Sequence, residues 1–213
     1  MSAPVVIVDY DPRWPALYEE EKDRIVAASG PVVLAIEHVG STAVPGLAAK
    51  PIIDIMAGVR TLDEAPALYG PLATIGYEYA PEFEETIPDR RFFRKGRAKY
   101  RTHHLHVVNF GDEFWVRHLL FREYLRRHTQ VAHDYEQLKR KLATEYGGNR
   151  QGYTEAKTDF IRGIEFLARA DTELAGKLPV GLPQIDVRLA RDGDQADRQD
   201  SQSAICIERP WRP

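Results

Sequence analysis

Gly40, Ser41 and Asp54 stand within a largely apolar stretch that runs from residue 35 to residue 59. A glycine can adopt the positive φ that turns neighbouring N–H groups toward one point, and a following helix start adds partial positive charge. Gly40 and Ser41 could therefore bind a phosphate, or they could form an ordinary turn between a strand and a helix. Asp54 could hold a divalent cation, because carboxylate oxygens are preferred ligands of such ions. Together the three residues predict metal and nucleotide chemistry.

Two histidines later in the chain could join Asp54. His104 and His106 stand two residues apart in a predicted strand over residues 100–110, so they share one face of that strand. Two imidazoles and one carboxylate suit a transition metal such as Zn²⁺, Mn²⁺ or Fe²⁺ better than Mg²⁺. Alternatively, one histidine could act as a general base, or both could be structural. Glu37 lies near the same corner and is a further candidate metal ligand.

Arginine and lysine side chains are candidates for binding phosphate oxygens. Arginine offers a planar fork that fits these oxygens, and lysine offers a point charge. Charges at this density more often belong to solvated faces of helices and strands, so a surface role is the alternative for each. The candidates are Arg91, Arg94, Arg101, Arg122, Lys139 and Lys157.

The hydrophobic pattern predicts the elements that position Asp54. Residues 32–39 and 51–59 have the composition of strands, and alternation along the second strand places Asp54 and Met56 on the same face. An unpaired carboxylate buried in such a strand would be strongly unfavourable. Asp54 therefore needs a partner, which could be a metal, a base or a cation such as Lys50.

The remaining elements complete the predicted domain. We expect helices over residues 12–28, 64–75, 113–128, 132–146 and 154–170, and further strands over 5–10, 77–80, 90–95 and 100–110. This order predicts an α+β (α/β layered) domain over residues 1–170, in which helices flank a mixed sheet and the C-terminal helices pack beside it. Residues 171–213 are polar and contain prolines, so we expect a disordered or loosely docked tail.

Composition limits the partners of the protein. The formal net charge is −3, so no global basic field favours nucleic acid or an anionic membrane. The chain has one cysteine, and none of its stretches approaches the roughly 20 apolar residues that span a bilayer. We expect a cytoplasmic protein without a membrane or nucleic-acid partner, and a homo-oligomeric state stays open.

Three motifs carry a resemblance to a known family. A strand, Gly-Ser, a short helix and a strand with an aspartate resemble the core of the nucleotidyltransferase superfamily. More narrowly, EHVGSTAVPGLAAKPIIDI, THHLHVV and FREYLRR resemble the GrpB family, a branch of that superfamily also found fused to some dephospho-CoA kinases. The resemblance covers residues 6–170, and Arg94, Arg122 and Lys157 stand in stretches that resemble the family's motifs.

The resemblance implies cofactors and residue roles. It implies a nucleoside triphosphate, with ATP expected, and a divalent metal, either Mg²⁺ or Mn²⁺, with Zn²⁺ or Fe²⁺ as alternatives. Two-metal transfer uses two carboxylates with one residue between them, and here Met56 occupies the second position. The residue patterns and the resemblance together give Asp54, His104 and His106 as candidate catalytic residues. The candidate nucleotide-binding residues are Gly40, Ser41, Lys50, Arg94, Arg122 and Lys157, and the candidate metal ligands are Asp54, His104, His106 and Glu37.

Three functions remain open. The first is transfer of a nucleotidyl group to a small acceptor, or activation of a carboxylate as its adenylate. The second is a non-catalytic module that binds a nucleotide or a protein partner, since Met56 replaces a carboxylate. The third is a transition-metal enzyme of another class, such as a hydrolase or ligase, that uses Asp54, His104 and His106.

Overall fold

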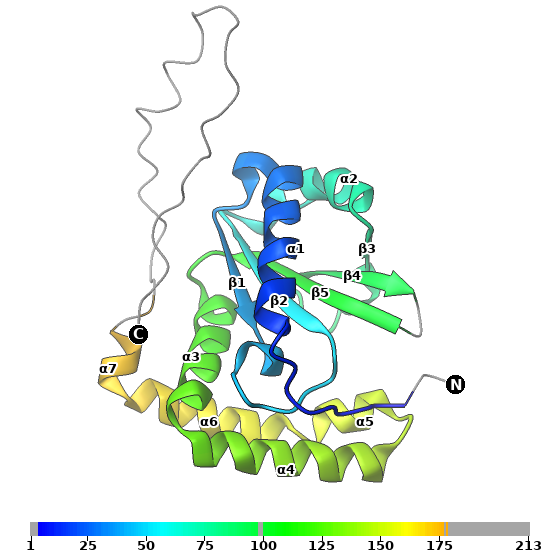
Figure 1. Cartoon of the computed structure of the whole chain (residues 1–213). Helices are drawn as coiled ribbons and strands as arrows, with labels where there is room; N and C mark the ends of the chain where they lie inside the picture. Colours follow the sequence, from blue (N-terminus) through cyan, green and yellow to red (C-terminus); the bar gives the residue numbers. More distant parts are fainter. Residues whose placement is uncertain (1–3, 98–99, 177, 179–213) are drawn as a thin grey trace, which may run out of the picture. The chain divides into compact units, whose positions relative to one another are not determined.

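The computed structural model describes residues 4–97, 100–176 and 178. Its centre is a five-stranded sheet with the order β1-β2-β5-β4-β3 (Figure 1). β2 and β5 run parallel, and the other three neighbouring pairs run antiparallel. The predicted α+β fold with a mixed sheet is confirmed. The strands are β1 (Ala35–Val39), β2 (Ile53–Val59), β3 (Tyr77–Tyr79), β4 (Arg91–Arg97) and β5 (Tyr100–Asn109).

Helices α1 (Trp14–Ser29) and α2 (Pro66–Thr74) cover one face of the sheet. Ile25 of α1 and Leu68 of α2 pack into one buried cluster with Ile55 of β2 and Leu105 of β5. Side chains alternate between the two faces along a strand. The alternate residues of β2, among them Asp54, therefore lie on the opposite face, as the sequence predicts.

Helix α3 (Glu113–Arg127) covers part of this opposite face. Met56 of β2 and Val108 of β5 are buried there against Trp115 of α3. Asp54 and His104 lie beyond this cluster, and their side chains are 32% and 26% exposed. This face of the sheet is therefore buried beneath α3 and remains accessible to solvent at Asp54 and His104.

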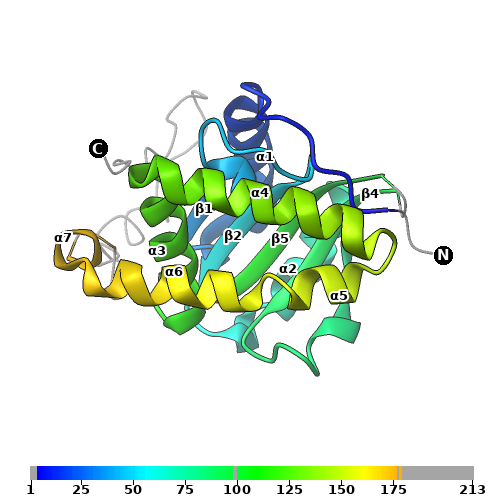
Figure 2. The same cartoon turned by 90° about the horizontal axis from the view of Figure 1, so that it is seen from below.

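Helices α4 (Thr129–Tyr146), α5 (Arg150–Glu155) and α6 (Thr158–Ala170) lie below the sheet in Figure 1 and cross in front of it in Figure 2. Tyr135 of α4 stacks on Phe160 of α6, with 5.3 Å between the ring centroids. The sequence predicts one helix over residues 154–170, whereas the chain leaves the helix at residues 156–157, between α5 and α6. Among the described residues, none of the helices combines the length and hydrophobicity needed to cross a bilayer.

The folded unit continues beyond the predicted boundary at residue 170. A short helix, α7 (Thr172–Ala175), follows α6, and Leu174 is buried in the same cluster as residues of α3 and α6. Burial of this apolar side chain fixes the start of the segment predicted to be a loose tail. The rest of that predicted tail, residue 177 and residues 179–213, lies outside the described residues.

Two local predictions are wrong. The strand predicted over residues 5–10 is not formed. These residues contain only one isolated β-bridge, between Val8 and Ala49. Lys95-Gly96-Arg97 predicts a turn between the strands expected over 90–95 and 100–110, but these residues are part of β4, where the register with β5 shifts between Lys95 and Gly96. Gly96 has a φ of 96°, which a β-bulge accepts and which L-residues avoid. A glycine in a strand can signal a bulge as well as a turn.

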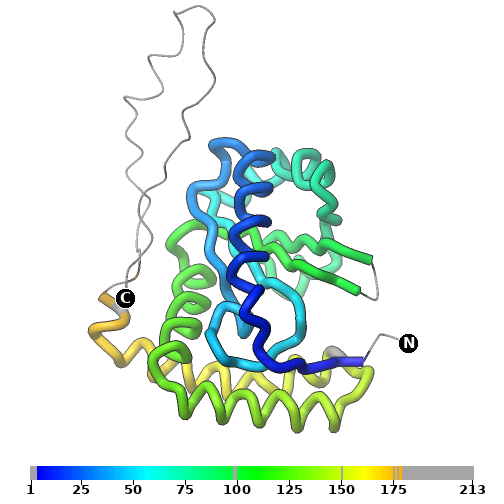
Figure 3. Tube along the Cα trace, in the orientation of Figure 1, coloured from blue at the N-terminus to red at the C-terminus, as the bar shows by residue number. Residues whose placement is uncertain are grey.

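The segment between β1 and β2 passes close to α4 (Figure 3). It begins with a short 3-10 turn, Ser41–Ala43. Farther along, the backbone N–H of Ala48 donates to Oε2 of Glu136 at 3.2 Å, and Lys139 donates to the carbonyl of Ala48. These contacts place Ser41 between the edge of the sheet and the C-terminal helices.

Candidate functional site

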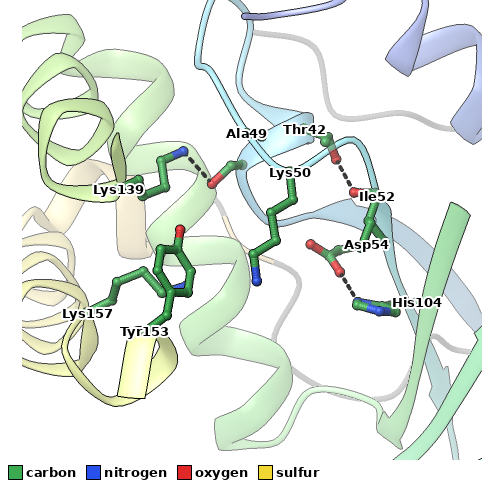
Figure 4. A pocket seen from close by; sticks show the side chains of 10 residues that line it. Thr42, Ala49, Lys50, Ile52, Asp54, His104, Lys139, Tyr153 and Lys157 are labelled. Carbon is green, nitrogen blue, oxygen red and sulfur yellow. Dashed lines mark hydrogen bonds and ion pairs between the residues drawn. The ribbon is translucent and has the colours of Figure 1, made fainter. Parts of the chain in front are cut away.

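A pocket of about 140 Å³ lies between the sheet, the segment after β1 and the C-terminal helices (Figure 4). One side comes from β2, β5 and the segment that joins β1 to β2. The other side comes from α4, from α5 and from the segment between α5 and α6. The residues that line the pocket are Ser41, Thr42, Ala49, Lys50, Ile52, Asp54, His104, Lys139, Tyr153 and Lys157.

Asp54 and His104 form a hydrogen-bonded pair on the sheet side of the pocket. The two residues are register partners in the parallel pair β2 and β5, and Nδ1 of His104 lies 3.0 Å from Oδ1 of Asp54. A carboxylate only accepts hydrogen bonds, so Nδ1 of His104 carries the proton that it donates. In a neutral imidazole, Nε2 of His104 then carries the lone pair. Burial would raise the pKa of Asp54, but the hydrogen bond from His104 and the nearby imidazole of His106 hold that pKa well below its usual range.

Gly40 lies directly against the carboxylate of Asp54. A Cβ atom at this position would lie 2.7 Å from Oδ2 of Asp54, and Gly40 has a φ of 72°. Both the contact and the backbone angle therefore require a glycine. The structure brings Gly40, Ser41 and Asp54 to one place, which is the arrangement predicted from the sequence.

Three lysines approach the pocket from separate parts of the chain. Lys50 and Lys157 both lie over the ring of Tyr153, with Nζ 4.6 Å and 4.5 Å from its centroid. Lys139 is 2% exposed and donates to Oγ of Ser41 at 3.0 Å. Figure 4 shows Lys139, Tyr153 and Lys157 across the pocket from Asp54 and His104. The pocket therefore gathers positive charge opposite a single carboxylate.

Burial changes the protonation of two of these lysines. It lowers the pKa of Lys139 to about 7, with a further contribution from the charge of Lys157. It also lowers the pKa of Lys157 to about 8, with Lys50 acting in the same direction and Asp54 opposing it. An anion in the pocket would favour the charged form of both side chains.

His106 lies apart from the pocket lining found in the described residues. Nδ1 of His106 is 3.1 Å from Nη1 of Arg90, and its Nε2 is 4.0 Å from Oδ1 of Asp54. Arginine only donates, so Nδ1 of His106 accepts and its Nε2 carries the proton. Burial and the charge of Arg90 together lower the pKa of His106 to about 4, although Asp54 opposes them. Within the described part of the chain, no group of three His, Cys, Asp or Glu side chains is placed to hold a metal ion.

Glu37 and Arg122 bond to each other away from the pocket. Nη1 of Arg122 lies 2.7 Å from Oε2 of Glu37 and 2.7 Å from the carbonyl oxygen of His38. Its Nε donates to Glu123 at 2.6 Å, and the residue is 8% exposed. Arg122 therefore holds β1 to α3, although the sequence suggests that it binds phosphate. Because Glu37 is bonded to Arg122, its carboxylate does not replace the one that is missing at Met56.

Three other predicted phosphate-binding arginines also lie away from the residues that line the pocket. Arg94 shares the face of Asp54 but bonds to Glu78 at 3.1 Å and Glu82 at 3.0 Å. Arg101 pairs with Glu78 at 2.9 Å, and Arg91 pairs with Glu84 at 3.5 Å. Of the predicted cations, Lys50, Lys139 and Lys157 are the ones that the structure brings to the pocket. Sequence reasoning overlooked Tyr153 and Thr42, although both stand inside or beside motifs that contain predicted site residues.

A family model described as GrpB protein matches residues 4–166. The chain belongs to the GrpB family. The crystal structure of GrpB from Enterococcus faecalis superimposes with a TM-score of 0.70 and 38% sequence identity, over 76% of this chain and 96% of that one. Every residue that lines the pocket lies within the range matched by the GrpB model.

Several curated relatives extend beyond the GrpB region. The UPF0157 protein YqkA of Bacillus subtilis is 39% identical over 161 residues, which are 76% of this chain and 46% of that protein. A dephospho-CoA kinase of Mycolicibacterium paratuberculosis is 30% identical over 75% of this chain and 45% of the kinase. The chain thus spans about half the length of these relatives. The predicted family, and its occurrence in some dephospho-CoA kinases, are confirmed.

Proposed function

We propose that this GrpB domain binds a nucleoside triphosphate, with ATP as the expected nucleotide, and transfers its nucleotidyl group to a small acceptor. One observation carries the proposal. Ser41 and three lysines from separate segments line one pocket, and they face a hydrogen-bonded pair, Asp54 and His104. Cations together with a Gly-Ser turn suit phosphate oxygens. The adjacent imidazole can accept a proton.

The phosphate-binding roles differ among the lysines. Lys139 bonds to Ser41 and to the carbonyl of Ala48, so it fixes the turn and places a buried charge behind the hydroxyl. Lys50 and Lys157 both lie over the ring of Tyr153, where each can reach a phosphate oxygen. In this assignment, Lys139 and Ser41 form the floor of the phosphate site and the other two lysines neutralise its charge.

The donor atoms at Asp54 fit one hard cation. The side chain of Asp54 is 32% exposed, and a carboxylate suits Mg²⁺ or Mn²⁺ whose other ligands are phosphates and water. A second ion is not supported, since Met56 is 0% exposed beneath α3 and Glu37 is bonded to Arg122. A Zn²⁺ or Fe²⁺ site is not supported either, because His106 is bonded to Arg90. When bound, the cation would supply charge neutralisation at the phosphates.

The transfer step requires a nucleophile and a leaving group. An oxygen of the acceptor forms a bond to the α-phosphorus while the bond from that phosphorus to the bridging oxygen of the β-phosphate breaks, and pyrophosphate leaves. A hydroxyl acceptor gives its proton to Nε2 of His104. Asp54 orients the imidazole through Nδ1 and stabilises the imidazolium that forms. A carboxylate acceptor gives an acyl adenylate by the same bond changes and releases no proton.

Calorimetric titration of the full chain with ATP and GTP, in the presence of Mg²⁺, tests the binding half. We expect saturable binding that weakens at least tenfold in Lys157→Met. Lys141→Met is the matched control, because Lys141 is an exposed lysine on α4 outside the pocket lining. If neither nucleotide binds the folded wild-type chain with Mg²⁺ or Mn²⁺, the proposal fails.

A second candidate function is a binding module without turnover. The observation that favours it is Met56, whose buried side chain stands where a second metal-binding carboxylate would be expected. Pyrophosphate release from ATP, measured against a panel of small alcohols, amines and carboxylates, separates the two functions. ATP binding without pyrophosphate release from any acceptor favours the binding module.

A further inference from the structure

Arg90 carries a buried guanidinium group that no carboxylate neutralises within the part of the chain that the structure describes. The residue is 9% exposed, and among the described residues it takes part in none of the ion pairs. Its Nε also has no hydrogen-bond partner in the described structure. Buried charges are normally paired, and buried donors are normally bonded. An oxyanion of a ligand could both neutralise the charge of Arg90 and accept its hydrogen bonds.

The position of Arg90 links it to the candidate site. Nη1 of Arg90 lies 3.1 Å from Nδ1 of His106, and the guanidinium carbon lies 4.6 Å from the centroid of the Phe92 ring. The same Phe92 ring lies 5.1 Å from the ring of His104 and 5.2 Å from that of His106. Arg90 is therefore separated from Asp54 by His106 and from His104 by the ring of Phe92.

Two neighbouring arginines, unlike Arg90, have carboxylate partners. Arg94 bonds to two glutamates, and Arg117 lies 3.3 Å from Glu165. Both are charges whose partners are supplied by the fold. Burial and the charge of Arg117 lower the pKa of Arg90 to about 10, while Asp54 opposes this. The environment of Arg90 is thus electropositive, and an added anion would relieve it.

We infer that Arg90 binds an oxyanion, a carboxylate or a phosphate, of the acceptor substrate. The inference rests on the proposed function, because it assigns to the acceptor a binding group close to Asp54 and His104. Guanidinium groups bind such oxyanions through charge-assisted hydrogen bonds, and Arg90 has further N–H donors besides the Nη1–H that faces His106. The substrate class is therefore a small organic acid or phosphate ester.

Titration of nucleotide-free protein labelled with ¹⁵N-arginine tests the site directly. The probes are benzoate, inorganic phosphate and neutral benzamide, and the Nε–H signal of Arg90 is identified by its loss in Arg90→Met. We expect benzoate or phosphate to shift this signal saturably, at concentrations at least tenfold below any effect of benzamide. Benzoate alone indicates a carboxylate acceptor, phosphate alone a phosphate ester, and either result supports the site.

Two variants separate binding from folding. Arg90→Met keeps an apolar contact to Phe92 and removes the charge, so we expect at least tenfold weaker probe binding with an unchanged or higher unfolding temperature. Arg91→Met is the matched control, because it removes the adjacent arginine, which pairs with Glu84. Equal probe binding in wild type and Arg90→Met, or a shift of the Arg90 signal by benzamide equal to that by benzoate, overturns the inference.

Calorimetry with ATP on the same proteins keeps the two proposals apart. ATP binding in wild type and in Arg90→Met shows that the nucleotide site stands independently of the anion site. Anion binding at Arg90 without any ATP binding refutes the proposed function and the acceptor role, while the anion site itself remains. ATP binding without anion binding at Arg90 refutes only the inference about the acceptor.

Discussion

Nδ1 of His104 lies 3.0 Å from Oδ1 of Asp54, although 50 residues separate them in the chain. The parallel register of β2 and β5 creates this pair, because it sets the two residues directly opposite each other on one face. The next pair in the register on this face, Met56 and His106, is different: Met56 is buried beneath α3 and His106 is bonded to Arg90. In the proposed function, the chemistry therefore depends on the first pair.

His104→Gln should separate catalysis from binding. If His104 takes the acceptor's proton, kcat for a hydroxyl acceptor falls on the order of 10²- to 10⁴-fold, while ATP affinity stays within a few-fold of wild type. His106→Gln is the matched control, and we expect less than about tenfold loss because His106 faces Arg90. Pyrophosphate release at saturating ATP measures both. Equal losses in the two variants would show that His104 has no special role.

Nucleotide affinity should fall as the pH rises above neutrality. Burial lowers the pKa of Lys139 to about 7 and that of Lys157 to about 8, so both side chains lose their protons as the pH rises through this range. A bound triphosphate favours the charged lysines, so binding takes up protons and weakens between about pH 7.5 and 9.5. Calorimetry in buffers of different ionisation enthalpy measures the proton uptake. In the double variant Lys139→Met, Lys157→Met, the residual binding should show no uptake, and uptake equal to wild type would contradict the assignment.

Gly40→Ala should disrupt the site more than a glycine replacement elsewhere. The new Cβ would lie 2.7 Å from Oδ2 of Asp54, so the carboxylate must move away from His104. Gly30→Ala is the control, because Gly30 also has positive φ, 57°, yet a Cβ added there would meet no heavy atom within 4 Å. Backbone strain costs each variant on the order of 1–3 kcal/mol. Denaturant unfolding and ATP titration should show a larger destabilisation and loss of binding in Gly40→Ala alone.

Met56→Asp should unfold the domain and should not restore a second metal site. Met56 is 0% exposed in a cluster with Trp115 and Leu119, so the new carboxylate would be buried without a partner. We expect a loss on the order of 3–5 kcal/mol, whereas Met56→Leu should cost less than about 1.5 kcal/mol. Urea unfolding measures both variants. A Met56→Asp protein as stable as wild type, with new metal-dependent turnover, would contradict the packing argument.

The strands and their faces could be predicted from the sequence because alternation is a local property. Alternation correctly puts Asp54 on the same face as Met56, and His104 on the same face as His106. Gly40 has the positive φ that the sequence suggests for a glycine at this turn. The partners of arginine side chains could not be predicted. Arg122 and Arg94 have long side chains whose partners come from β1 and β3, and only the packed fold brings those carboxylates within reach.

Lys50, Lys139 and Lys157 are among the cations that the sequence predicts, but pattern analysis does not show that they meet in one pocket. Helical periodicity indicates which residues a helix buries, but it does not indicate where the helix lies relative to a sheet. Lys139 occupies a core-facing position on α4, where a cation is unexpected, and that was the available signal. Arg90 gave no signal, since it precedes a strand in a stretch of similar charges.

The two sides of the pocket belong to different parts of the chain, and this limits how the domain can be shortened or recombined. A fragment that ends after α3 would keep aspartate, histidine and serine but would lack Lys139, Tyr153 and Lys157. Gene fusions that join this domain to a different protein must therefore carry the C-terminal helices along with the sheet if the pocket is to be kept. Occupancy of the pocket would also tether those helices, so protection from proteolysis between α3 and α4 would report a bound ligand.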